Sequence, residues 1–396
     1  MPWKVTNPVS ERLKFLARLQ AGERMTDLCE EFGISRKAGY RLRDRFATLG
    51  VAALVDGSRA PKRVANRTSA EIRELLVTTR LQHPSWGPRK LRAWLLYKHQ
   101  GLTLPAASTI GDLLRREGLV EPRRMRRSTP AWTGGRSQPV APNQLWCADY
   151  KGEFRLGNAQ YCYPLTITDR FSRMLLACDG FESIATSSTR QAFEAVFREY
   201  GLPDAIRTDN GAPFASRGLH GLSRLSAWWL RLGIRHERIE PAHPEQNGQH
   251  ERMHLDLKKQ TTRPAAPTLL QQQERFDAFV HEYNHERPHE ALGQTPPARH
   301  HLSSLRLFPE RLPELTYPLH DRTSSLSPSG HVRLGGRDSS YFIASALGGE
   351  PVGLREVNDG LWLVSYADLD LGHIDERRHC FEPAEPHEPT HENAAE

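Results

Sequence analysis

The sequence has few cysteines and no long apolar run, and each absence excludes a class of protein. Its 396 residues include five cysteines without a Cys-x-x-Cys pair, so neither a disulfide framework nor a structural zinc site is indicated. No run of about 18 apolar residues is present, as a membrane-spanning helix would need. The first residues also lack the apolar core of a signal peptide. We therefore expect a cytoplasmic protein without a membrane partner.

Acidic residues are scarce in the first third of the chain, where basic residues dominate. Residues 1–140 carry 27 Lys and Arg against 12 Asp and Glu, whereas the remainder carries 27 against 35. The net charge of +7 therefore combines +15 at one end with −8 over the rest. This separation predicts that the N-terminal part binds a polyanion. Because its basic helices are short and broken by turns, nucleic acid is favoured over a membrane surface.

A chain of this length should form several domains. The pattern changes along the sequence predict all-α helix-turn-helix units, then an α/β core, then a small β-barrel. The expected boundaries are a helix-turn-helix domain at 1–60, a second helix-turn-helix or winged-helix-like domain at 61–122, a basic linker at 123–142, the core at 143–300, a linker at 301–322, the barrel at 323–380 and a disordered acidic tail at 381–396.

Residues 8–49 have the pattern of a helix-turn-helix motif. A short helix with Leu28 and Phe32 ends at Gly33, and Ser35 can cap the next helix. That second helix is basic, and in this motif it enters the major groove of DNA. A solvated basic helix in a bundle is the alternative. The predicted DNA contacts on it are Arg36, Lys37, Tyr40, Arg41 and Arg43.

A second helical unit spans about 68–120, with Leu91, Trp94 and Leu95 expected in its small core. The segment behind it has four arginines within five positions, followed by Pro, Gly and Ser. Such a segment can lie along phosphates or in a minor groove, although a solvated linker fits equally well. The four arginines are Arg123, Arg124, Arg126 and Arg127.

The pattern changes at residue 145. Apolar runs over 145–154, 160–169 and 173–181 predict hairpin-linked strands, and alternating helices and strands follow, which indicates an α/β core. Asp149 lies inside the first strand, where a charged side chain is costly unless it binds something. Asp209 ends the fourth strand in the sequence TDNG, which alone would be an ordinary turn. If these strands are parallel neighbours, the two carboxylates lie side by side and need a cation.

A third carboxylate on a neighbouring helix would complete a two-metal site. Glu245 and Glu251 both occur in PAHPEQNGQHERMH. Glu245 follows Pro244 in an expected loop, whereas Glu251 lies inside a helix that runs to about Lys259. Because a helix fixes the carboxylate, Glu251 is the predicted ligand.

Five stretches carry a resemblance to a known family: LWCADYKGEF, YPLTITDRFSR, YGLPDAIRTDNGAPFAS, PAHPEQNGQHERMHLDLK and YNHERPHEALGQTPP. They resemble the RNase H-like core of retroviral integrases and of bacterial insertion-sequence transposases of the DDE group that have tandem N-terminal helix-turn-helix units. This resemblance implies that Asp149, Asp209 and Glu251 are the catalytic triad and hold two Mg²⁺ or Mn²⁺ ions. It also implies that Lys258, seven residues beyond Glu251, contacts phosphates.

Two further features complete the expectations. The family's Tyr-Asn-Arg-Pro segment appears here as Tyr283, Asn284, Arg287 and Pro288, and the barrel resembles the C-terminal barrels of integrases, with a structural cap as the alternative. Four histidines of the core invite a metal interpretation, but we expect them to contact DNA or cap helices. They are His236, His243, His250 and His254.

Together these features predict a transposase that binds terminal inverted repeats, cleaves 3′ ends with metal ions and transfers the strands to target DNA. Its expected partners are double-stranded DNA of both kinds and at least one further copy of the chain, in the bacterial nucleoid. No small-molecule cofactor is expected. The alternatives are an inactive DNA-binding regulator, which would not nick DNA, and an RNase H-like nuclease, which would not join pre-cut ends.

Overall fold

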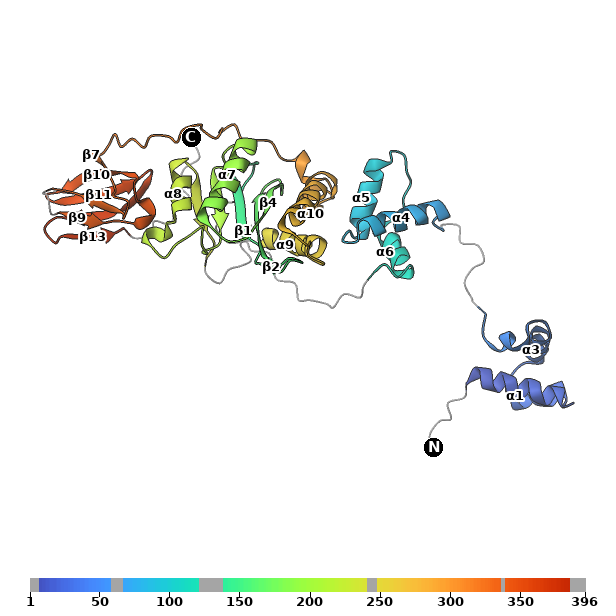
Figure 1. Cartoon of the computed structure of the whole chain (residues 1–396). Coiled ribbons are helices and arrows are strands. Elements are labelled where there is room, and N and C mark those ends of the chain that lie inside the picture. The colour runs from blue at the N-terminus through green and yellow to red at the C-terminus, as the bar shows by residue number, and fades with distance from the viewer. Residues whose placement is uncertain (1–6, 58–66, 121–137, 241–247, 336–338, 385–396) are drawn as a thin grey trace. The chain divides into compact units, whose positions relative to one another are not determined.

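The computed structural model describes residues 7–57, 67–120, 138–240, 248–335 and 339–384. The chain divides into two compact units, Met1–Thr68 and Ser69–Glu396. Figure 1 shows small helical units, a sheet flanked by helices, and a C-terminal group of strands. Among the helices described, none combines the length and apolarity that crossing a membrane requires.

The first unit contains α1 (Pro8–Gln20), α2 (Met25–Glu31) and α3 (Arg36–Leu49), followed by a 3-10 turn (Gly50–Leu54). As predicted, Ser35 caps α3, and its hydroxyl accepts the backbone N–H of Ala38 at 3.2 Å. Gly39 lets α2 and α3 approach closely, since a Cβ there would lie 2.7 Å from Sγ of Cys29. The short helix, the turn and the basic helix therefore follow one another as the sequence predicts.

The next helices are α4 (Ala70–Gln82), α5 (Pro88–Lys98) and α6 (Ala107–Arg116). Leu91 and Leu95 of α5 are fully buried between them, and Trp94 packs against this core, as predicted. The indole of Trp86 is also fully buried there and stacks on His83, with 3.8 Å between ring centroids.

A mixed sheet forms the centre of the second unit. Its strands are β1 (Leu145–Tyr150), β2 (Phe154–Arg155), β3 (Tyr161–Asp169), β4 (Leu175–Phe181), β5 (Ala205–Thr208) and β6 (Arg235–Arg238). The order is β2-β3-β1-β5-β6, with β4 paired to β3. The first pairs are antiparallel hairpins, whereas β5 runs parallel to both β1 and β6. This arrangement agrees with the predicted strands.

Helices cover both faces of this sheet (Figure 1). They are α7 (Thr186–Tyr200), α8 (Arg224–Arg231), α9 (Gly248–Thr261) and α10 (Leu269–His281), and short helical turns follow at Glu282–Glu286, Glu290–Leu292 and Pro297–Arg299. Trp146 of β1 packs against α7 and α8 in one apolar cluster. Met253 of α9 and Phe276 of α10 belong to a second cluster with β4. Because side chains alternate along a strand, Cys147 and Asp149 face the side opposite Trp146.

The C-terminal part contains β7 (Arg322–Ser325), β8 (His331–Arg333), β9 (Ser340–Phe342), β10 (Pro351–Asn358), β11 (Leu361–Tyr366), β12 (Leu369–Asp375) and β13 (Cys380–Pro383). The predicted closed barrel is not confirmed. In the described residues, a five-stranded antiparallel sheet, β13-β12-β11-β10-β7, and a separate β8-β9 ribbon leave the sheet open. The ribbon packs Val332 and Tyr341 against Val352 and Val364 of the sheet, so the apolar face is buried without closure. The last strand also extends to Pro383, past the expected start of the tail at 381.

This C-terminal sheet packs against α8. The hydroxyl of Tyr366 donates to the carbonyl of Ala227 at 3.1 Å, and Ala227 shares the apolar cluster of the sheet. Arg231 also forms an ion pair with Glu350 at 2.9 Å. The contacts tie the C-terminal strands to the helix that covers β1.

Candidate active site

The parallel pairing of β1 and β5 positions two aspartates. Cys147 lies opposite Arg207 in this pairing. Continuing the register by two residues brings Asp149 across from Asp209, which follows the last residue of β5. The carboxyl ends of parallel strands meet at one edge of a sheet, a usual place for a ligand site. The two carboxylates are therefore neighbours, as the sequence analysis expects.

The TDNG turn holds Asp209 in place. Its Oδ1 accepts the backbone N–H of Gly211 at 3.2 Å, and the Asn210 amide donates to the carbonyl of Ile239 at 2.8 Å. A Cβ at position 211 would lie 3.1 Å from Oδ2 of Asp209, so a larger residue would press on the carboxylate. Each residue of the turn thus has a part in orienting Asp209.

Asp149 is half-buried beside other negative charges. Burial, followed by the charge of Asp209, raises its pKa to about 7, and Glu251 contributes in the same direction. The nearby ammonium of Lys151 acts the other way. A bound cation would favour the ionised carboxylate, which makes this corner suited to divalent ions.

Glu251 lies in the first turn of α9, and its side chain is exposed. Its charge contributes to the raised pKa of Asp149, so Glu251 lies within electrostatic reach of that carboxylate. Glu245, the alternative, lies outside the described residues, as do Arg123, Arg124, Arg126 and Arg127. Lys258 is exposed on the same helix as Glu251. The five predicted DNA contacts on α3 are exposed as well: Arg36, Lys37, Tyr40, Arg41 and Arg43.

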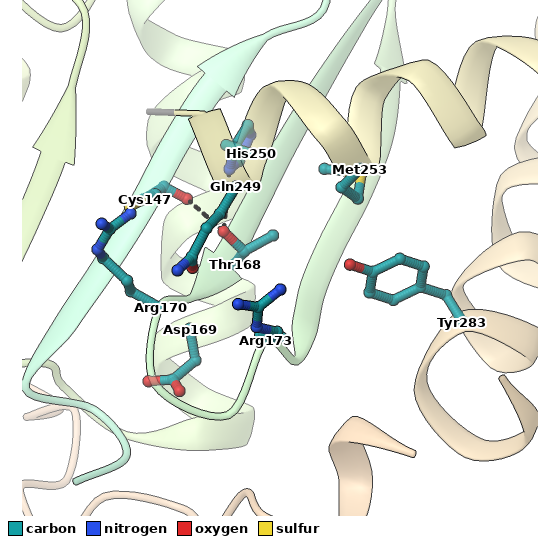
Figure 2. A pocket seen from close by; sticks show the side chains of 9 residues that line it. All are labelled: Cys147, Thr168, Asp169, Arg170, Arg173, Gln249, His250, Met253 and Tyr283. Atoms are coloured by element: carbon teal, nitrogen blue, oxygen red, sulfur yellow. Dashed lines mark hydrogen bonds between the residues drawn. The ribbon is translucent and has the colours of Figure 1, made fainter. Parts of the chain in front are cut away.

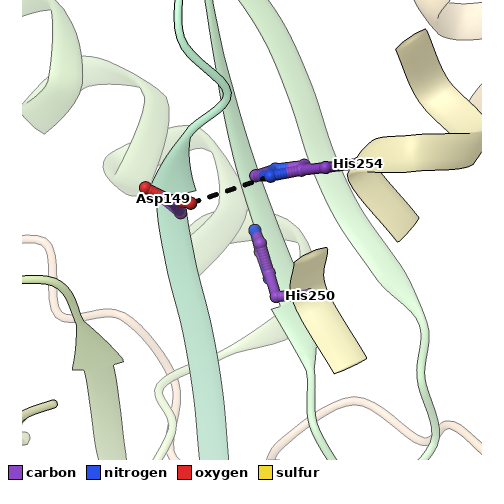
Figure 3. A group of neighbouring side chains, drawn as sticks. All are labelled: Asp149, His250 and His254. Atoms are coloured by element: carbon purple, nitrogen blue, oxygen red, sulfur yellow. Dashed lines mark ion pairs between the residues drawn. The ribbon is translucent and has the colours of Figure 1, made fainter. Parts of the chain in front are cut away.

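Two histidines expected to contact DNA or cap helices are instead buried beside Asp149, so that expectation is wrong for them. His250 and His254 are 2% and 4% exposed. Together with Asp149 they offer ligand atoms that all lie within 4.8 Å of one another (Figure 3). The reason is the orientation of α9, whose inner face carries both histidines. His236 also faces inward and contacts the Thr208 hydroxyl at 2.9 Å, and His243 lies outside the described residues.

Two threonines of β3 hold these histidines. The Thr166 hydroxyl lies 2.7 Å from Nε2 of both His250 and His254, and the Thr168 hydroxyl lies 2.9 Å from Nδ1 of His250. Burial lowers the pKa of His250 to about 3 and also lowers that of His254, which favours the neutral form of both rings. Sequence reasoning missed this network, although its spacing was visible. Histidines four apart share a helix face, and threonines two apart share a strand face.

A small hollow adjoins this network without reaching Asp149. Figure 2 shows its lining: Cys147, Thr168, Asp169, Arg170, Arg173, Gln249, His250, Met253 and Tyr283. The carboxylate of Asp169 is already hydrogen-bonded within the protein, since it accepts from Asn143 and Ser172 at 2.6–2.7 Å. The carboxylates proposed from sequence therefore lie on the edge of the sheet and not in this hollow.

The Tyr-Asn-Arg-Pro segment joins α9 to the sheet. The Asn284 side chain accepts from the N–H of Leu175 at 2.9 Å and donates to its carbonyl at 2.8 Å, which fixes the segment to β4. Arg287 donates to Asp256 of α9 at 2.5 Å in a buried ion pair. The segment consequently sets the position of the helix that carries Glu251 and His254.

Known domain families match both the N-terminal helical part and the mixed-sheet core of the chain. Integrase core domain families match residues 139–244 and 232–297. A helix-turn-helix domain family matches residues 11–62, and a homeodomain-like domain family matches residues 38–114. These matches include the mixed sheet, α9 and the three-helix unit with α3.

Curated relatives come from mobile elements and retroviruses. An insertion element IS476 protein of Xanthomonas euvesicatoria is 31% identical over 180 residues, which are 44% of this chain and 50% of the relative. An insertion element IS407 protein of Burkholderia multivorans is 28% identical over 54% of this chain and 74% of the relative. The Gag-Pol polyprotein of baboon endogenous virus is 29% identical, over 46% of this chain and 10% of its own length. The chain thus spans half or less of two of these relatives.

Solved structures to which the chain is similar include an HTLV-2 integrase domain and a simian T-cell lymphotropic virus intasome. The HTLV-2 integrase catalytic core domain in complex with magnesium aligns at 19% identity and a TM-score of 0.33, covering 41% of this chain and all of that one. A simian T-cell lymphotropic virus intasome chain aligns at 19% identity and a TM-score of 0.37, covering 78% and 98%.

Proposed function

We propose that this chain, which matches integrase core domain and helix-turn-helix domain families and is similar to insertion-element proteins, is the transposase of an insertion element. It binds the terminal inverted repeats, cleaves the 3′ ends and transfers them to target DNA. Its core has the RNase H-like fold. Because two ends are joined together, at least two copies act on DNA.

The observation that carries the proposal is the register of β1 against β5. It aligns Asp149 with Asp209 at one edge of the sheet, where burial and the charge of Asp209 raise the pKa of Asp149. Glu251 supplies a third carboxylate from α9. Three oxygen ligands of this kind suit Mg²⁺ or Mn²⁺ together with a substrate phosphate.

In the proposed reaction, Asp149, Asp209 and Glu251 would hold two divalent ions. Bound ions of this kind activate the attacking oxygen and stabilise the leaving oxygen in phosphoryl transfer. The protein residues supply position: the TDNG turn fixes Asp209, β1 fixes Asp149, and Arg287 fixes the helix of Glu251. Lys258 and the arginines of 123–127 contact the DNA backbone in this proposal.

Cleavage of end-labelled DNA tests the function. With Mg²⁺, the full chain should nick DNA that carries the inverted repeats flanking its gene, and EDTA should abolish the nick. Binding without any cleavage, in either Mg²⁺ or Mn²⁺, would instead support an inactive DNA-binding regulator.

The exposed basic face of α3 should provide repeat recognition. Arg36→Ala or Arg41→Ala in the full chain is expected to reduce the preference for repeat DNA over unrelated DNA about tenfold, since one base contact contributes about 1–3 kcal/mol. Fluorescence anisotropy with the two DNAs at several salt concentrations measures this preference. Lys14→Ala is the matched control, because Lys14 is exposed on α1 and pairs with Glu11. An unchanged preference in both α3 variants would remove α3 from recognition.

A further inference from the structure

The buried pair of histidines behind Asp149 has no role in the reaction described so far. His250 and His254 lie one turn apart on the inner face of α9, with ring centroids 4.5 Å apart and planes at 84°. Neither is needed to fill an apolar core, because Met253 and Leu257 on the same face already pack into it. Their polar neighbours show what they can do.

The hydroxyl of Thr166 contacts both imidazoles and the backbone of β1. It lies 3.2 Å from the carbonyl of Asp149, which can only accept. The same oxygen lies 2.7 Å from Nε2 of His250 and 2.7 Å from Nε2 of His254. When the hydroxyl donates to the carbonyl, both rings donate to the hydroxyl oxygen, and each carries its proton on Nε2.

The two histidines differ at their other nitrogen. Nδ1 of His250 lies 2.9 Å from the Thr168 hydroxyl, which also lies 3.4 Å from the carbonyl of Cys147, so both nitrogens of His250 have a hydrogen-bond partner. Nδ1 of His254 faces Oδ2 of Asp149 at 3.7 Å (Figure 3). The separation is too long for a hydrogen bond. With the proton of His254 on Nε2, a lone pair on Nδ1 and a carboxylate oxygen face each other.

We propose that Nδ1 of His254 is a nitrogen ligand of the divalent ion that Asp149 holds, which favours a later transition-metal ion such as Zn²⁺ over Mg²⁺ at this site. Bonds from Zn²⁺ or Mg²⁺ to nitrogen and oxygen are about 2.0–2.2 Å long, so two ligands of one ion lie at most about 4 Å apart. The observed 3.7 Å satisfies this limit. His250 keeps both its hydrogen bonds and supports Thr166.

The chemistry of the ligand sets the expected selectivity. Mg²⁺ is bound through oxygen, whereas imidazole favours ions later in the first transition row. Adding His254 to the carboxylates should therefore strengthen Zn²⁺ binding more than Mg²⁺ binding. This inference rests on the proposed function, because it concerns the same metal site.

Electron paramagnetic resonance of bound Mn²⁺ tests the ligand directly, without relying on activity. The full chain is loaded with MnCl₂, and electron spin echo modulation detects nitrogen bound to the ion. We expect imidazole modulation that disappears in Asp149→Asn, which identifies the site, and in His254→Ala. The Mn²⁺ affinity of His254→Ala should fall about 10–100-fold.

Two further variants separate ligation from folding. Thr166→Val keeps the shape of the strand but removes the acceptor that places the proton on Nε2, so it should also weaken Mn²⁺ binding. His285→Gln is the matched control, because His285 is an exposed histidine of the same core. Its modulation and affinity should equal those of the wild type.

The possible outcomes distinguish the role of His254 from the proposed transposase function. Mn²⁺ that binds through Asp149 without nitrogen modulation would overturn the role of His254 and leave the transposase proposal intact. An absence of Asp149-dependent Mn²⁺ binding would contradict the metal site itself. If His254→Ala fails to fold, the wild-type spectrum and Thr166→Val still decide.

Discussion

Asp149→Asn or Asp209→Asn should lower the rate of DNA nicking about a thousandfold or more, with repeat binding almost unchanged. Either change removes a metal ligand, and the charge stabilisation that bound ions give contributes several kcal/mol. DNA binding should persist because the basic face of α3 belongs to a separate compact unit. Single-turnover cleavage and anisotropy on the same preparations measure the two effects.

Two glutamates provide the matched pair for this prediction. Glu251→Gln should lose nicking as completely as the aspartate variants, because Glu251 acts on Asp149 from the first turn of α9. Glu245→Gln, six residues earlier, should keep substantial activity. The reverse result would assign the third ligand to Glu245, and loss of repeat binding in the aspartate variants would contradict a purely catalytic role.

Arg287→Ala should lower the free energy of unfolding of the core by about 3–5 kcal/mol, because it leaves Asp256 as a buried charge without its partner. The side chains of Arg287 and Asp256 are 6% and 13% exposed, so water cannot replace the ion pair. Urea unfolding followed by tryptophan fluorescence measures the change, since Trp146, Trp228 and Trp229 are buried in the core.

Replacing both charged residues by apolar ones separates the effect of the ion pair on stability from the effect of general packing. Arg287→Met combined with Asp256→Leu should recover most of the lost stability, because an apolar pair of similar volume can replace a buried ion pair. Arg252→Ala, an exposed arginine of the same helix, should change the unfolding free energy by less than about 0.5 kcal/mol. A small effect of Arg287→Ala would show that the segment does not fix α9.

The sequence predicts the two aspartates because local patterns determine their strands. The alternation around Asp149 and the turn residues after Asp209 are sufficient to define β1 and β5, and a parallel pairing then brings the carboxylates together. The register that aligns them depends on long-range packing. Trp146 and Ile206 contribute to this packing, since both belong to the apolar cluster with α7 and α8.

The histidines show where a local interpretation fails. The spacing of His250, Met253, His254 and Leu257 is that of a buried helix face, yet histidine is mostly expected at the surface. Burial becomes favourable because Thr166 and Thr168 contact three of the four ring nitrogens, and these partners lie more than 80 residues away. The spacing of the two histidines and that of the two threonines are each visible in the sequence. The sequence does not show that the two pairs contact each other.

The C-terminal strands illustrate a second limit. Glycine turns predict the presence of short strands, but closure depends on whether β7 and β13 pair at the two edges. In the described part of the chain, the β8-β9 ribbon covers the apolar face and the edges stay separate. Edge pairing is a non-local property that the spacing of turns does not specify.

Strand transfer with pre-cut ends is the most direct test of a transposase. Repeat DNA with a recessed 3′-hydroxyl is incubated with target plasmid, Mn²⁺ or Mg²⁺ and the full chain, with Asp209→Asn as the inactive control. We predict joined products in which the 3′ end is linked to target DNA, present with the wild type and absent with the variant or with EDTA. Metal-dependent nicking of the same DNA without any joined product would contradict the account and identify a nuclease.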